Sequence, residues 1–392
     1  MNVPLAVPNL GGREAEYLQE CVESTFVSSA GPFVGRFQDR IAEISGTERS
    51  VVTCSGTVAL QMALEGLGIG AGDLVMVPSL TFIASTNAIR HSGAAVWLVD
   101  STPTDWTMDL DVARRVIESE TEPHPRGRRH LVTGEVLTAI MPVMIMGATL
   151  DFESSTRLAT EYGLKVVVDA AAAIGARGLN DELLGATGVD AVCYSFNGNK
   201  TVTSGGGGAV AAADTRLVER IDHLISTGRV GSNYEHDVVA YNFRMTNVEA
   251  AIGVAQLERL PLFLERKRQV FERYAELAER VENVAAFPTP VGGRSTHWFS
   301  GLVYTGDDID QCTAFRAHMV ARGVDVRPFW KPVHLQLPYL TSLRTEMDVA
   351  EHLWDRILPL PCSTGISDEE LDYVVRRAAE FWERPASGNG DG

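Results

Sequence analysis

The segment AVCYSFNGNKTVTSGGGGAV, residues 191–210, joins two apolar stretches through a polar loop that ends in four consecutive glycines. Both stretches, Ala191–Phe196 and Gly208–Ala212, are short and have the apolar composition of buried strands. The glycines Gly205–Gly208 let the backbone turn tightly and approach a ligand closely. The segment therefore predicts two strands of a buried sheet, with Lys200 on the loop between them.

Short apolar runs alternate with helical periods on the N-terminal side of this segment. The predicted strands are Ser50–Thr53, Leu74–Val77, Ala95–Val99, Leu137–Val143 and Lys165–Val168, and the predicted helices are Thr57–Leu67, Thr81–Arg90 and Phe152–Tyr162. This alternation predicts an α/β fold in which helices sandwich a mostly parallel sheet. Gly12–Phe26 is predicted to be a separate amphipathic helix outside this core, and the charged segment Glu118–His130 an exposed loop.

The pattern changes in the C-terminal third of the chain. Asn247–Val281 is predicted to be a long helical stretch that kinks or breaks at Pro261. It is followed by the predicted strands Trp298–Tyr304 and Val324–Arg327 and the predicted helices Ile309–Arg322 and Asp368–Trp382. We therefore predict a large α/β domain with the N-terminal helix over residues 1–281, a smaller α+β domain over residues 282–384, and a disordered tail over residues 385–392.

Composition excludes several classes of function. Acidic residues outnumber basic residues by 51 to 34, and the formal net charge of -17 disfavours a nucleic-acid partner. The five cysteines are scattered and the histidines lack ligand spacing, so neither a disulfide framework nor a metal site is expected. The sequence has no signal peptide and no apolar stretch of membrane-spanning length, so we expect a cytoplasmic protein without a membrane partner.

Three short segments carry residues suited to chemistry. Lys200, at a strand exit, would have the lowered pKa that a Schiff-base lysine needs, and Ser195 nearby could donate to a phosphate, although lysines beside glycine-rich loops are often solvated turn residues. Asp169 ends the apolar run Val166–Val168, where α/β enzymes place their ligands; alternatively, it caps a following helix.

The third segment, Thr53–Leu60, has the order strand, tight turn and helix. Gly56 and Thr57 would offer backbone N–H groups at a helix N-terminus, where a phosphate is favoured, and Ser55 and Thr57 would add hydroxyl donors. A plain capped helix start explains the same residues equally well.

Taken together, the motifs resemble those of DegT-type (DegT/DnrJ-like) nucleotide-sugar aminotransferases. They occur in family order as SGTVAL (55–60), PSLTFIAS (78–85), VVVDAAAAIGA (166–176), SFNGNKTVTSGGGGAV (195–210), YNFRMTNVEAAIGVAQL (241–257) and RPFWKPVHLQLPY (327–339). The resemblance spans nearly the whole chain. It implies the aspartate-aminotransferase type of pyridoxal 5'-phosphate-dependent fold, and a homodimer whose active sites lie between two chains.

The resemblance also implies roles for individual residues. Lys200 would carry the cofactor as a Schiff base, and Asp169 would pair with the pyridine nitrogen. The expected cofactor-binding set is Ser55, Gly56, Thr57, Phe82, Asp169, Ser195, Lys200 and Asn242, with Phe82 against the ring face and Asn242 serving the neighbouring subunit. The candidates for substrate or interface contacts are Arg244, Trp330, Lys331 and His334. Core packing explains Phe82 and Trp330 as well, and an ion pair explains Arg244.

Two departures from the family pattern bear on function. Ala172 stands where many members have Gln or Glu, and Gly205–Gly208 replaces the common GEGG. The form SFNGNK before a glycine run is similar to members that aminate UDP-linked 4-keto-6-deoxy-N-acetyl sugars. The family's dehydratases carry histidine at position 200, so the retained lysine favours transamination.

The sequence therefore predicts an aminotransferase that moves an amino group from glutamate to a nucleotide-linked keto-sugar, of the 4-keto-6-deoxy kind, by a ping-pong mechanism. Two alternatives stay open. One is a pyridoxal-phosphate-dependent sugar dehydratase or lyase on the same scaffold. The other is a catalytically silent cofactor-binding regulatory protein.

Overall fold

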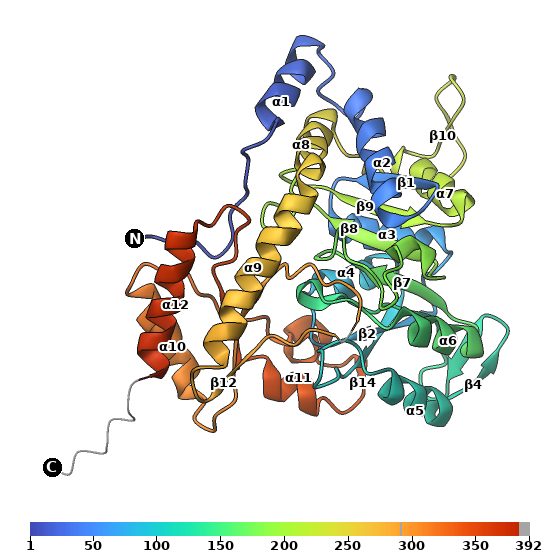
Figure 1. The fold of residues 1–392 in the computed structure, drawn as a ribbon. Helices are drawn as coiled ribbons and strands as arrows, with labels where there is room; N and C mark the ends of the chain where they lie inside the picture. The colour runs from blue at the N-terminus through green and yellow to red at the C-terminus, as the bar shows by residue number, and fades with distance from the viewer. Residues whose placement is uncertain (291, 384–392) are drawn as a thin grey trace.

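One mixed sheet of ten strands forms the centre of the computed structural model, which describes residues 1–290 and 292–383 (Figure 1). Its path is β1-β9-β8-β7-β6-β2-β3-β14, and the hairpin β4–β5 joins it at β6. The strands are β1 Arg49–Thr53, β2 Asp73–Pro78, β3 Ala95–Val99, β4 Thr121–His124, β5 Gly127–His130, β6 Val136–Ile140, β7 Lys165–Asp169, β8 Ala191–Ser195, β9 Gly208–Ala212 and β14 Leu343–Arg344. From β8 to β14 along the path every pairing is parallel, whereas β9 is antiparallel to both β8 and β1. The predicted mostly parallel sheet is confirmed.

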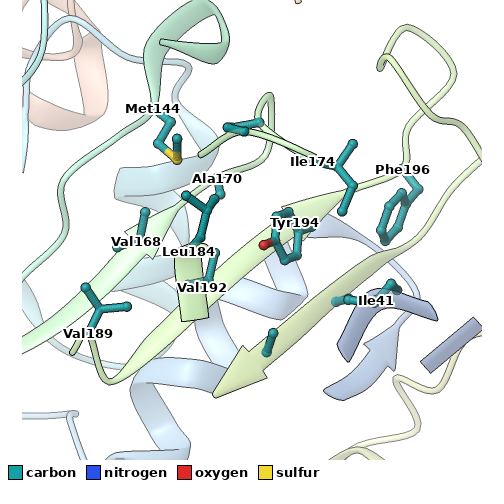
Figure 2. Close-up of a cluster of buried hydrophobic side chains, with 14 of the residues drawn as sticks. Ile41, Met144, Val168, Ala170, Ile174, Leu184, Val189, Val192, Tyr194 and Phe196 are labelled. Carbon is teal, nitrogen blue, oxygen red and sulfur yellow. The ribbon is translucent and has the colours of Figure 1, made fainter. Parts of the chain in front are cut away.

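Helices cover both faces of this sheet because successive side chains of its strands point to opposite sides. On β7, Val166 and Val168 belong to one buried cluster and Val167 to another. The first cluster is packed by α1 Glu14–Glu23, α2 Pro32–Ser45, α5 Leu110–Glu120, α6 Phe152–Tyr162 and α8 Asn247–Glu258, and part of it is drawn in Figure 2. The second is packed by α3 Gly56–Gly66, α4 Ala84–His91 and α7 Thr215–Ile225.

A long helical segment leads from the large sheet to a smaller layer of helices and strands (Figure 1). Its first helix, α8, starts with a capping box between Thr246 and Glu249, and the chain breaks at Arg259 before α9, Leu260–Ala278, as Pro261 predicted. The smaller layer contains the antiparallel strands β12 Val284–Ala286, β13 Ser300–Tyr304 and β15 Ile357–Leu360 with the helices α10 Asp310–Val320, α11 Asp348–Leu353 and α12 Asp368–Trp382. The C-terminal half of α9 packs its apolar side chains into this layer.

The structure corrects two predicted elements. Glu118–His130 is not a plain loop, because Thr121–His124 and Gly127–His130 form a hairpin whose second strand also pairs with β6. Val324–Arg327 is not a strand, since only Val324 forms a single bridge, to Val3. A short hairpin of Arg229–Val230 (β10) and Glu235–His236 (β11) projects beyond α7 in Figure 1.

The proposed division at residue 282 stays a prediction. β14, from the C-terminal part of the chain, lies in the large sheet beside β3, and Val3, from the N-terminus, packs with α10 and α12. The expected disordered tail, residues 385–392, lies outside the described residues. Within the described ranges no helix has the length and apolarity needed to cross a membrane.

The strand directions place three predicted site segments at one edge of the sheet. β7 and β8 are parallel, and β1 points the same way because both β1 and β8 are antiparallel to β9. The ends of these strands, at Thr53, Asp169 and Ser195, therefore meet at a common edge, where open α/β sheets bind their ligands.

Candidate active site

A cavity of about 420 Å³ opens at this edge of the sheet. Its lining includes nine positions singled out from the sequence: Ser55, Gly56, Thr57, Phe82, Asp169, Ala172, Ser195, Lys200 and Trp330. The remaining wall comes from distant segments, among them Leu5 and Ala6 at the start of the chain and Arg327–Phe329 near its end. The fold thus gathers into one cavity residues that are spread over most of the sequence.

Asp169 supplies a buried carboxylate to the cavity. The residue is 5% exposed, and burial raises the pKa of its carboxyl. Ser85 Oγ donates a hydrogen bond to Oδ2 at 2.6 Å, and the backbone N–H of Ala171 donates to Oδ1 at 3.0 Å. These bonds and the charge of Lys200 oppose the effect of burial and favour the ionised form. No α-helix follows Asp169 directly, so it does not act as the helix cap considered from the sequence.

Lys200 supplies an amine to the same cavity. Burial lowers the pKa of Lys200 to about 8, and the carboxylate of Asp169 opposes this shift. Its Nζ lies 3.7 Å from the ring centroid of Trp298. With a pKa near 8, an appreciable fraction of the amine is neutral at physiological pH, as nucleophilic attack on an aldehyde requires. Lys200 is therefore not an ordinary solvated turn residue.

The N-terminus of α3 faces the cavity beside Ser195. Ser55 Oγ accepts a hydrogen bond from the backbone N–H of Val58 at 3.2 Å and so caps this helix. A methyl group at Gly56 would lie 2.6 Å from Cβ of Ser195, closer than side chains tolerate, so glycine lets the helix start and the Ser195 side chain approach each other. A helix N-terminus with hydroxyl groups beside it is suited to bind a phosphate.

Four predicted site residues do not line the cavity. Asn242 and Lys331 are exposed, and Arg244 is half-buried with its backbone bridged to Thr53. His334 is buried: its Nδ1 lies 2.7 Å from Ser79 Oγ and its Nε2 lies 3.0 Å from Glu351 Oε1. Both ring nitrogens thus contact other side chains.

Two residues at the site were missed by sequence reasoning. Ser85 lies inside the quoted motif PSLTFIAS, but only the fold shows that it reaches Asp169 on another strand. Trp298 precedes β13 and contacts Lys200 across the cavity. No sequence pattern links positions 200 and 298, so tertiary structure is needed to find this contact.

The groups in the cavity fit pyridoxal 5'-phosphate. An amine of lowered pKa suits its aldehyde, a buried carboxylate suits a protonated ring nitrogen, and the start of α3 suits its phosphate. Among the described residues, no group of three or more His, Cys, Asp or Glu side chains could hold a metal ion.

Comparisons with known proteins agree with this chemistry. The model of the DegT/DnrJ/EryC1/StrS aminotransferase family matches residues 8–378. A GDP-perosamine synthase from Escherichia coli O157:H7 is 35% identical over 382 residues, which cover 97% of this chain and 98% of that protein. A UDP-N-acetyl-3-dehydro-alpha-D-glucosamine 3-aminotransferase from Acidithiobacillus ferrooxidans is 31% identical, with 86% of this chain and 85% of that protein covered.

A solved structure of a DegT DnrJ EryC1 StrS aminotransferase from Brucella abortus superposes with a TM-score of 0.85 at 26% identity, covering 95% of this chain and 96% of that chain. The family match, the relatives and the fold all point to the same class of enzyme. The chain therefore belongs to the DegT/DnrJ/EryC1/StrS aminotransferase family and is a pyridoxal-phosphate-dependent aminotransferase.

Proposed function

We propose that the protein transfers an amino group from glutamate to a nucleotide-linked keto-sugar of the 4-keto-6-deoxy kind, in two half-reactions at one site. The observation that carries the proposal is that the Lys200 amine and the Asp169 carboxylate face one cavity. The names of the relatives support a nucleotide sugar as acceptor, and they include both GDP-linked and UDP-linked sugars. The nucleotide is therefore left to experiment, and the UDP preference suggested by SFNGNK stays a prediction.

In this proposal each residue has a separate task. The bound cofactor supplies a ring that delocalises a carbanion. Asp169, held ionised by Ser85, keeps the ring nitrogen protonated. The freed amine of Lys200 would take the proton from the α-carbon of glutamate and deliver it to the cofactor carbon that the lysine had left, on the far side of the transferred nitrogen, acting first as base and then as acid. The same amine moves the proton in the opposite sense at the carbon that was the sugar ketone.

The remaining cofactor-binding residues would hold and shield the reacting groups. Ser55, Gly56, Thr57 and Ser195 would bind the phosphate at the start of α3. Phe82 would pack against the ring face, and its own ring lies 5.5 Å from that of Trp330. Trp330 is our candidate for a substrate contact, because it lines the cavity and its side chain is uncharged.

We further propose a homodimer in which Asn242 serves the partner's site. Asn242 is exposed and does not line its own chain's cavity. Nearby on the same segment, Tyr234 is 76% exposed and Val239 is 96% exposed, as expected of apolar side chains that another chain covers. Mixing inactive Lys200→Ala and Asn242→Ala chains should restore activity, because mixed dimers contain one site with both residues intact. Lack of recovery in demonstrated mixed dimers would contradict the shared site.

The function is tested by donor-dependent amination of a panel of GDP-, UDP- and dTDP-linked keto-sugars, with 2-oxoglutarate and the amino sugar both quantified. We expect one keto-sugar to be aminated with glutamate in a ratio of one 2-oxoglutarate released per sugar. Turnover of the sugar without any donor would indicate the dehydratase or lyase instead. A stable cofactor spectrum with every amino-acid donor would indicate the silent binding protein.

A further inference from the structure

Trp298 is the aromatic residue that Lys200 contacts in the cavity. Only 2% of the residue is exposed, and Nζ of Lys200 lies 3.7 Å from its ring centroid. An ammonium group at this distance over an indole face is attracted by the electron density of the ring, and the attraction is larger where water is excluded. The contact joins the segment before β13 to the loop after β8, two parts of the chain that lie about a hundred residues apart.

Two hydrogen bonds fix the position of the indole. Its Nε1 donates to the carbonyl of Asn199 at 2.7 Å, directly beside Lys200 in the chain. The carbonyl of Trp298 accepts from Nζ of Lys267 at 2.6 Å, and this same ammonium donates to the carbonyl of Cys362 at 2.5 Å. Lys267, on α9, is itself buried. The indole is therefore held through its own N–H, and the backbone that carries it is held through Lys267.

Two of the few lysines in this chain contact Trp298. The sequence has four lysines, Lys165, Lys200, Lys267 and Lys331. Lys165 pairs with Asp190 at the surface and Lys331 is exposed, whereas Lys200 and Lys267 are the two that both contact Trp298.

We propose that Trp298 is a positioning residue whose ring face keeps the freed ε-amino group of Lys200 near the reacting carbons, and attracts it most strongly in the ammonium form that exists between proton uptake and proton delivery. The inference rests on the proposed role of Lys200 in amino transfer. A lysine side chain has four flexible bonds, and a freed amine must stay within reach of the reacting carbons to move a proton between them. The indole limits where the amine goes, while Lys267 holds the backbone that carries the indole.

The charged groups around the amine act in known directions. Burial lowers the pKa of Lys200, and the carboxylate of Asp169, on β7, opposes that change. Arg327 lines the same cavity, and Lys267 donates a hydrogen bond to the backbone carbonyl of Trp298. The ring face adds a second interaction that favours the ammonium form, besides Asp169.

The proposal is tested on cofactor-free protein by competitive labelling of amines over a range of pH, with mass spectrometry of each lysine peptide. Trp298→Met removes the ring, so we expect the midpoint of Lys200 labelling to fall by about 0.5 to 1.5 pH units, the equivalent of a cation–π contact. Trp298→Phe keeps a ring face and should shift the midpoint by less than half as much. Lys331, on the surface, is the internal reference and should not change.

Trp330→Leu is the matched control, since it removes another indole that lines the same cavity. An unchanged or higher midpoint in Trp298→Met, or an equal fall in Trp330→Leu, would overturn the proposal. Should Trp298→Met fail to fold, reductive ¹³C-methylation of the wild-type protein still tests whether Lys200 contacts the indole. Methyl signals of Lys200, assigned with Lys200→Arg, should then lie upfield of those of Lys331 because of the indole ring current, and coincident signals would refute the contact.

The outcome is separable from that of the proposed function. Borohydride reduction of the cofactor-loaded protein shows whether Lys200 is the attachment point. A cofactor fixed to another residue would refute the proposed function and leave the labelling result as it stands. A cofactor fixed to Lys200 with no effect of Trp298→Met would refute only the positioning role.

Discussion

Ser85→Ala is expected to weaken cofactor binding in a pH-dependent way. The change removes the 2.6 Å hydrogen bond from Ser85 Oγ to Asp169 Oδ2 and leaves the bond from the Ala171 N–H in place. A hydrogen bond to a buried charged group contributes about 1.5–3 kcal/mol, which corresponds to roughly tenfold to 150-fold in an equilibrium constant. Burial already raises the pKa of Asp169, and loss of this donor raises it further.

The sign of the effect follows from which form binds the cofactor. The ionised carboxylate pairs with the protonated ring nitrogen, so affinity falls as the pH drops through the pKa of Asp169. In Ser85→Ala this fall begins at higher pH. On the acid side, where Asp169 is protonated in both proteins, the variant should bind roughly tenfold to 150-fold more weakly, and at high pH the two affinities should converge.

The assay is an absorbance titration of cofactor-free protein with pyridoxal 5'-phosphate between about pH 4 and pH 9, a range that starts near the ordinary pKa of an aspartate and extends upward, the direction in which burial moves the pKa of Asp169. The matched control is Ser92→Ala, at the C-terminal end of the same helix, whose hydroxyl donates to the carbonyl of Ile89 at 2.8 Å. Equal affinities of Ser85→Ala and wild type at every pH would refute the reasoning. A loss of the same size at every pH would also refute it, because it would indicate damaged packing rather than altered ionisation.

Three further predictions concern the cofactor site. Lys200→Ala should show no cofactor fixed by borohydride, whereas Lys331→Ala, at the surface, should be labelled like the wild type; fixation to the first variant would refute the assignment. Asp169→Asn should lower turnover by about a hundredfold or more, as loss of one preorganised charge does, and wild-type kcat in that variant would contradict its role. Gly56→Ala places a methyl group 2.6 Å from Cβ of Ser195 and should lower the free energy of unfolding by about 1–3 kcal/mol in a denaturant titration. Unchanged stability would contradict the close approach of the helix start to Ser195.

Much of the fold is predictable from local sequence because its strands are apolar on both faces. Lys165–Asp169 and Ala191–Ser195 read directly as buried parallel strands. Elements that are held by long-range strand pairing cannot be predicted in this way. The hairpin Thr121–His124 with Gly127–His130 is polar and contains Pro123, so its pairing with β6 leaves no periodic signal. The two-residue strand Leu343–Arg344 is too short to show any pattern.

The same distinction applies to the site. Lys200 and Asp169 were found because each ends or follows an apolar strand, where a polar residue stands out. Ser85 and Trp298 were not found from the sequence. Each contacts a residue that is far away in the chain, Asp169 for Ser85 and Lys200 for Trp298. His334 is the opposite case, because this histidine of a family motif contacts Ser79 and Glu351 and does not line the cavity, so its contact with a substrate stays a prediction.

The first residues of the chain form part of the catalytic cavity, and this affects how the enzyme can be handled. Val3 is held against Val324, and Leu5 and Ala6 then lie in the cavity wall. Trimming these few residues would therefore remove one side of this cavity while leaving every recognisable motif intact. An affinity tag fused in front of Met1 would join the chain only a few residues from the cavity wall, so kinetic constants should be measured after the tag has been cleaved.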